Sequence, residues 1–190
     1  FGISLVVDGF SAIMLMAAAL VLLATYAYCD EQLRDTAGGL FYPLFHLLAL
    51  GVQWSLVTGD LFNLFVAFEI MLISSYALLV LGTSRGQMRQ AYKYVLLNLL
   101  ASMVLVTSCG LIYGHVGTLN FADLARLSHS GAIPSSAVPA ICLLLLAFGV
   151  KSALFPAWFW LPDSYPTVPA GLGAVLGGLL TKVGAYVLIR

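Results

Sequence analysis

Three ionisable residues lie within long apolar stretches of the 190-residue sequence: Glu69, Lys151 and Lys182. Glu69 is the ninth residue of LFNLFVAFEIMLISSYALLVLG, which covers residues 61–82. A helix of this length rises about 33 Å, enough to cross the hydrocarbon core of a bilayer. An ionised side chain in that core costs at least about 2.5–3.5 kcal/mol, and such residues are candidates for ion pathways and proton relays.

A buried glutamate beside a buried lysine can capture and release a proton without any cofactor. Desolvation disfavours the charged form of each group, whereas their mutual attraction favours it. At about 8 Å and an effective dielectric constant near 20, this attraction is roughly 2 kcal/mol. Moving or neutralising the glutamate would therefore release a proton from the lysine.

Each of the three residues also has a purely structural interpretation. The two lysines could extend their ammonium groups to a membrane interface, and Glu69 could be a protonated group that only holds helices together. The sequence contains eight acidic and eight basic residues in total. Three of these few charges inside apolar stretches favour a relay of buried groups over three separate structural roles.

The composition is that of a polytopic membrane protein. Hydrophobic residues make up 62% of the sequence and charged residues only 8%, and the mean hydropathy is +1.03. A soluble domain usually carries about 25% charged residues. The net charge of zero gives no electrostatic footprint for nucleic acid. Because Cys29, Cys109 and Cys142 lack the spacing of a zinc or iron–sulfur site, no metal and no cofactor is expected.

The apolar pattern predicts an all-α bundle of transmembrane helices. Six apolar runs bounded by polar or turn residues are the candidate spans: 10–29, 40–58, 61–82, 90–113, 137–155 and 170–190. We expect them to form one transmembrane domain, residues 1–190, which is part of a longer membrane protein. No initiator methionine precedes Phe1, and Arg190 directly follows an apolar run.

Basic residues predict the orientation of this bundle. Four of them fall on one side: Arg34, Arg85, Arg89 and Lys93. The opposite loops contribute Arg126 alone, so the positive-inside rule makes the first side cytoplasmic. The loop 114–136 would then face outward, and LNFADLARL within it has the apolar rhythm of a short interfacial helix.

Two other polar residues each have two interpretations. Asp60 precedes the span 61–82 and is well placed to cap its N-terminus, which we favour over a functional role. His46 lies inside the span 40–58 and could pass protons, although a single histidine in a span more often bonds a neighbouring carbonyl.

The sequence after Lys151 predicts a broken helix. It reads SALFPAWFWLPDSYPTVPAG, with prolines at 156, 162, 166 and 169. A continuous helix cannot pass through these prolines. The span could end at Phe155 with the aromatic residues at the interface, or it could break and resume up to about residue 168. We favour the break, because it places Lys151 near the middle of the membrane, where broken helices accompany transport sites.

Four segments together carry a resemblance to a known family. They are VDGFS at 7–11, GDLFNLFVAFEIMLISSYALL at 59–79, KSALFPAWFWLPDSYPTVP at 151–169 and LLTKVGAYVLIR at 179–190. With them the chain resembles the antiporter-like membrane subunits of Mrp-type Na⁺/H⁺ antiporters, respiratory complex I and membrane-bound hydrogenases. Within that family, residues 59–79 are most similar to the D-type subunits of the Mrp antiporters.

The resemblance implies a fold of about fourteen transmembrane helices with two inverted five-helix repeats, each containing a broken helix. This chain is similar to helices three to eight of that fold. Glu69 matches the glutamate of the family's helix five, and Lys151 matches the lysine at the break in helix seven. Lys182 matches the helix-eight lysine that leads to the second half-channel.

The implied function is that of a proton-translocating subunit in a multisubunit monovalent cation (Na⁺)/proton antiporter of a prokaryotic plasma membrane. Such a protein is an ion transporter rather than an enzyme. Its implied partners are other hydrophobic subunits of the same complex, the lipid bilayer, protons and Na⁺. An alternative is a proton-pumping subunit of a redox-driven complex, and a second is a structural subunit whose buried charges only hold helices together.

Overall fold

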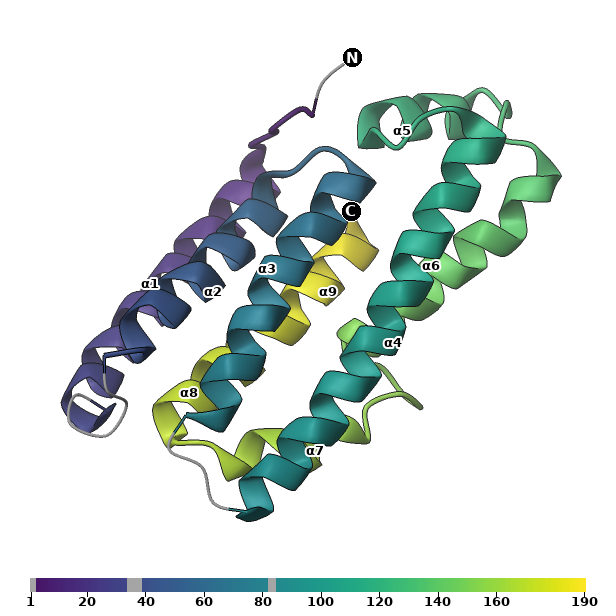
Figure 1. Ribbon diagram of the computed structural model, residues 1–190. Coiled ribbons are helices and arrows are strands. Elements are labelled where there is room, and N and C mark those ends of the chain that lie inside the picture. The colour runs from purple at the N-terminus through teal and green to yellow at the C-terminus, as the bar shows by residue number, and fades with distance from the viewer. Residues whose placement is uncertain (1–2, 34–38, 82–84) are drawn as a thin grey trace.

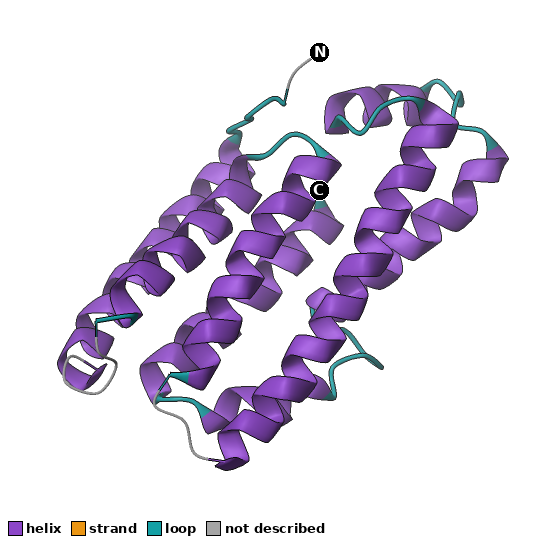
Figure 2. Ribbon diagram, viewed as in Figure 1, coloured by secondary structure: helices purple, strands orange, loops and turns teal. Residues whose placement is uncertain are grey.

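The computed structural model describes residues 3–33, 39–81 and 85–190, and this part of the chain is a bundle of helices without any strand (Figures 1 and 2). Long helices lie side by side, and shorter ones cross the two ends of the bundle. The nine α-helices of the described residues are α1 (Gly9–Leu33), α2 (Phe41–Val57), α3 (Leu61–Val80), α4 (Arg85–Val116), α5 (Phe121–His129), α6 (Val138–Lys151), α7 (Trp160–Ser164), α8 (Ala170–Val175) and α9 (Thr181–Ile189).

Several of these helices are long and apolar enough to cross a membrane. Among the described residues, four segments meet both conditions: Gly9–Asp30, Leu61–Val80, Gly86–Val116 and Ala170–Ile189. The apolar segments Phe41–Val57 and Ser135–Lys151 are shorter. The protein is therefore all-α and polytopic, as its composition predicts.

Helix α3 begins where the sequence predicts a cap. The Asp60 carboxylate accepts hydrogen bonds from the backbone N–H groups of Phe62 and Asn63, both at 2.9 Å. It thereby satisfies two of the four amide groups that have no partner inside the first turn. The predicted capping role of Asp60 is confirmed. Gly51 then lets α2 approach α3 closely, because a Cβ added there would lie 2.6 Å from the backbone nitrogen of Met71.

The predicted helix break is present and lies directly after Lys151. Helix α6 ends at this residue, and helical structure resumes at Trp160 in α7. Figure 1 shows α6 ending partway along α4, while α7 crosses one end of the bundle. The broken-helix interpretation is confirmed, and the helix ends four residues earlier than the predicted limit of 155.

The early end of α6 has a local cause. Ala153 adopts a left-handed backbone conformation with φ 54°. Its N–H donates to the carbonyl of Val150 at 3.1 Å, and the N–H of Leu154 donates to that of Gly149 at 2.9 Å. This pair of bonds is the Schellman motif, which usually places glycine at the left-handed position. Because alanine stands there instead, the sequence carries no glycine signal for the helix end.

The last predicted span, 170–190, is helical but not uniform. A π-helical segment, Leu176–Leu180, separates α8 from α9 and lies directly before Thr181 and Lys182. Single π-helical turns inside α-helices are rare and occur frequently at functional sites. The sequence pattern does not reveal this segment, because its residues are as apolar as those of the flanking helices.

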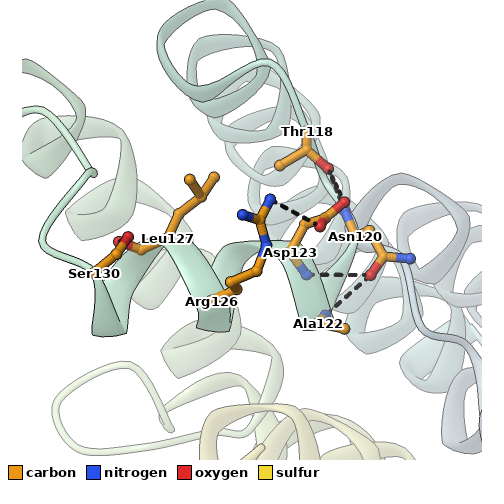
Figure 3. A network of polar contacts seen from close by, with 7 residues as sticks. All are labelled: Thr118, Asn120, Ala122, Asp123, Arg126, Leu127 and Ser130. Atoms are coloured by element: carbon orange, nitrogen blue, oxygen red, sulfur yellow. Dashed lines mark hydrogen bonds and ion pairs between the residues drawn. The ribbon is translucent and has the colours of Figure 1, made fainter.

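The predicted interfacial helix corresponds to α5, which lies across the bundle end opposite to α7 (Figure 1). Asn120 caps it by accepting from the N–H groups of Ala122 at 3.0 Å and Asp123 at 3.4 Å. Figure 3 shows Asp123 held between the guanidinium of Arg126 at 3.4 Å and the hydroxyl of Thr118 at 3.5 Å. All of these contacts lie within residues 118–126, so they order the short helix and the turn that precedes it.

The predicted cytoplasmic end is the one crossed by α7. Arg85 begins α4, and Lys93 on the same helix forms a 3.0 Å ion pair with Asp163 of α7. Arg34, which the same prediction includes, lies outside the described residues. The assignment of this end to the cytoplasm stays a prediction.

Candidate functional site

The candidate site combines side chains from three helices. Lys151, the last residue of α6, is buried with 3% of its surface exposed, and its Nζ donates to Ser102 Oγ on α4 at 2.9 Å. The Ser102 hydroxyl in turn donates to Glu69 Oε1 on α3 at 2.5 Å. The two bonds leave Nζ and Oε1 no more than about 5.4 Å apart. The structure therefore brings two of the three predicted residues together through a third.

Ser102 joins groups that do not touch each other. Within the described part of the chain, no ion pair links Glu69 directly to Lys151, and the serine hydroxyl bridges them. A hydroxyl is a donor and an acceptor at once, so the bonds form a continuous chain from an ammonium to a carboxylate. Such a chain can carry a proton as well as hold two charges in place.

Apolar and aromatic side chains enclose the ammonium group. The Nζ atom of Lys151 lies 5.0 Å from the ring centroid of Phe68, within the range of a cation–π interaction. The ring of Phe148 lies 6.0 Å from that of Phe68, and both side chains are buried. Water is thus kept away from the lysine, whereas Glu69 is only partly buried.

The sequence did not identify Ser102. Serines inside apolar helices commonly bond a carbonyl of the preceding turn, so their presence alone carries little information. Ser108 on the same helix does this by donating to Leu105 O at 2.7 Å. Only the packing of α3, α4 and α6 shows that Ser102 points to a carboxylate on another helix.

Lys182 lies apart from this group. The sequence predicts a buried side chain, whereas among the residues that the structure describes the side chain is exposed. Its Nζ donates to the carbonyl of Gly177 at 2.9 Å and to the hydroxyl of Thr181 at 3.3 Å. The reason is the register of α9, which turns Val183 and Gly184 inward and leaves residue 182 at the edge of a cavity of about 200 Å³ between α1, α2 and α9.

Helix α9 nevertheless contacts the helix break. A Cβ added to Gly184 would lie 2.5 Å from Ser152 Oγ, 3.0 Å from Ser152 N and 3.2 Å from the carbonyl carbon of Lys151. Only glycine fits this approach without displacement. The contact connects the backbone of Lys151 to the helix that carries Lys182.

The histidine of the second span takes the commoner of its two predicted roles. His46 is exposed, and its Nδ1 lies 2.7 Å from the carbonyl oxygen of Tyr42, one turn earlier in α2. Its ring also packs edge-on against Tyr26 at a centroid distance of 5.6 Å. These contacts are structural, so His46 is not part of the candidate site.

A polar group at the α5 end of the bundle ties the first helix to the last. Asp8 accepts from the N–H of Ser11 at 2.8 Å and from the Arg190 guanidinium at 2.9 Å. The hydrogen bond from the Ser11 N–H is the largest cause, and the one from the Arg190 guanidinium is the second. Together they lower the pKa of Asp8 from its ordinary 3.8 to about 2. Arg190 also donates to the hydroxyl of Tyr186 at 2.9 Å. This group is a helix cap joined to an ion pair.

Residues 58–190 match the family described as "NADH:quinone oxidoreductase/Mrp antiporter, TM". The chain belongs to this family. Its whole length is also 43% identical over 195 aligned residues to the D-type subunit of the Na⁺/H⁺ antiporter of Alkalihalophilus pseudofirmus, covering 39% of that protein. The chain thus spans about two fifths of the length of the curated relatives that it matches. The predicted membership of the antiporter-like subunit family is confirmed.

Solved structures of the family share this fold. A chain of the Mrp complex from Dietzia sp. DQ12-45-1b matches with a TM-score of 0.87 and 34% identity, over 98% of this chain and 35% of that chain. A chain of an archaeal membrane-bound sulfane sulfur reductase matches with a TM-score of 0.86 and 32% identity, over 100% of this chain and 39% of that chain. The helix arrangement is therefore that of the antiporter-like membrane subunits, and the protein is a multi-pass membrane protein.

Proposed function

We propose that the protein is a proton-translocating subunit of a multisubunit monovalent cation/proton antiporter in a prokaryotic plasma membrane. The observation that carries this proposal is the hydrogen-bonded chain of Lys151, Ser102 and Glu69 inside an apolar bundle, directly at a helix break. Relatives named as D-type subunits of Na⁺/H⁺ antiporters support Na⁺ as the exchanged cation.

In this function Lys151 loads and unloads the proton, and Glu69 controls how firmly the lysine holds it. Their charged atoms are no more than about 5.4 Å apart. At an effective dielectric constant near 20, this separation corresponds to an attraction of at least about 3 kcal/mol, or a factor of roughly 10² in proton occupancy. A movement of either side chain out of this contact changes the occupancy of the lysine by that factor.

Lys182 receives the proton next and passes it laterally, away from the first pair. The close contact of Gly184 with Ser152 and the backbone of Lys151 supports a connection between the two lysines. A shift of the helix break must move α9, because no free space separates them. The π-helical turn before Thr181 is a place where α9 can adjust.

The partners of this subunit are other hydrophobic subunits of the same complex, together with lipid. Several large apolar side chains of α1 are about two thirds exposed, which a protein in water would not tolerate over such an area. They follow one face of the helix: Ile13, Met16, Leu20 and Leu23.

The test is Na⁺-dependent dissipation of a pH gradient in everted membrane vesicles that contain the native complex. Lys151→Ala and Glu69→Gln are compared with wild type, and Arg126→Ala is the control, since its exposed ion pair with Asp123 lies on α5. We expect exchange to be lost in the first two variants and kept in the control, with the complex assembled in all. Exchange near the wild-type rate in both site variants would overturn the relay and leave helix packing as the role of these residues.

A second candidate function is proton pumping in a redox-driven complex. The match to a chain of the archaeal sulfane sulfur reductase favours it. In the same vesicles, wild-type protein would then show no cation-dependent exchange and would acidify the lumen only when an electron donor is supplied. Exchange without a donor excludes this alternative.

A further inference from the structure

We propose that Ser102 is the proton carrier between Lys151 and Glu69. This proposal rests on the proposed relay function. It deepens that function by assigning a proton-transfer role to a residue on a third helix.

The bonding of Ser102 differs from that of other serines in the described helices. Five of those donate to a carbonyl of their own helix: Ser55, Ser74, Ser75, Ser108 and Ser164. Ser102 donates its single proton to Glu69 of α3 and accepts from Lys151 of α6. With 4% of its surface exposed, it is enclosed in the bundle. Its hydroxyl therefore forms hydrogen bonds with both ionisable groups.

The direction of the two bonds defines one proton transfer. An N–H bond of the Lys151 ammonium breaks while an O–H bond forms on the lysine side of Ser102. The original O–H bond of Ser102 breaks while an O–H bond forms on Glu69. The products are a neutral amine, a serine hydroxyl and a carboxylic acid. No electrons leave the three residues, and no further reactant is needed.

The transfer reverses the orientation of the serine hydroxyl. Before transfer its hydrogen points to Glu69, and after transfer its hydrogen points to the nitrogen of Lys151. A second proton cannot follow until the hydroxyl has rotated back, because the oxygen then has no hydrogen directed at Glu69. The hydroxyl therefore rotates once between successive transfers through the pair.

Three variants of the native complex test this role in the same vesicle assay. Ser102→Ala removes the carrier, Ser102→Thr keeps a hydroxyl, and Ser108→Ala removes another fully buried hydroxyl of α4 that bonds only its own helix. A positioned proton-transfer group typically contributes about 10²–10⁴-fold to rate. We expect Ser102→Ala to lose at least about 10²-fold in exchange rate, with Ser102→Thr and Ser108→Ala close to wild type. Assembly of each variant is checked on native gels.

The exchange rates of the serine variants are compared with those of Lys151→Ala and Glu69→Gln. If these two abolish exchange while Ser102→Ala stays near wild type, the relay stands and the serine carrier is overturned. Equal losses in Ser102→Ala and Ser108→Ala, or equal losses in Ser102→Ala and Ser102→Thr, indicate a packing role and also overturn it. If Lys151→Ala and Glu69→Gln leave exchange intact, the proposed function itself fails, which is a separate outcome.

Discussion

Replacing Gly184 by alanine should disturb the relay without touching any of its polar groups. The new Cβ would lie 3.0 Å from Ser152 N and 3.2 Å from the carbonyl carbon of Lys151. Ordinary carbon contacts lie at about 3.5–4.0 Å. Because these two partners are backbone atoms, α9 and the end of α6 must separate by several tenths of an ångström. The displaced atoms belong to the residue whose ammonium bonds Ser102.

The expected change in stability of Gly184→Ala combines two opposing contributions. Overpacking of a well-packed interior costs about 1–3 kcal/mol. Alanine in a helix is favoured over glycine by about 1 kcal/mol, so the expected loss of stability is up to about 2 kcal/mol. The rate of exchange should fall by a larger factor. A displacement of about 1 Å can slow a reaction that depends on exact positioning by about 10²-fold.

Gly149→Ala is the matched control, because it adds the same methyl group two residues before Lys151, where nothing lies within 4 Å. The assay combines thermal unfolding of the purified complex in detergent with Na⁺-dependent exchange in vesicles. We expect lower stability and slower exchange for Gly184→Ala, but no loss of stability and unchanged exchange for Gly149→Ala. Adding Ser152→Ala to Gly184→Ala removes the nearest contact, at 2.5 Å, and should restore only part of the loss. Identical behaviour of the two glycine variants would refute the close-approach reasoning.

Three other predictions concern the helices around the site. Asp60→Ala should cost about 0.5–2 kcal/mol of stability in thermal unfolding through the loss of the α3 cap, whereas Asp60→Asn should keep most of it. Gly51→Ala should reduce the yield of folded protein on size exclusion, because the new Cβ would lie 2.6–2.8 Å from the backbone of Met71 and its Cβ; an unchanged yield contradicts this packing. The carboxylate of Asp8 should titrate near pH 2 by carbon-13 chemical shift. Since its pKa lies below the ordinary 3.8, its stabilising contribution is complete above about pH 4 and is lost as the pH falls towards 2; a midpoint near 3.8 would show that the cap is absent.

Sequence patterns predicted the features that depend on neighbours along the chain. Apolar runs mark the membrane helices, since length and composition decide whether a helix can cross a bilayer. Asp60 directly before an apolar run marks a cap, and the prolines after Lys151 mark a break. Each of these signals acts within a few residues of the place where its effect is seen.

Features that depend on packing between helices could not be predicted in this way. Ser102 has the same local sequence character as Ser108, and only the position of α3 beside α4 makes it a bridge. The end of α6 was placed too late, because Ala153 occupies a position where glycine is the usual signal. The exposure of Lys182 depends on the rotation of α9 about its axis, which its uniformly apolar pattern does not fix.

The free-energy balance at Lys151 explains why a break, a carboxylate and an aromatic ring occur together. Holding two ionised groups in the apolar bundle costs about 2.5–3.5 kcal/mol each. Their attraction across Ser102 stabilises the pair by at least about 3 kcal/mol. The C-terminal end of α6 carries partial negative charge beside the ammonium and adds up to about 2 kcal/mol, and the Phe68 ring adds about 0.5–2 kcal/mol. Gains and costs are thus of equal size, so the bundle holds the ionised pair at little net cost. The break, the carboxylate and the aromatic ring each stabilise the ammonium, and the loss of any one of them would leave the cost of burying it unmet.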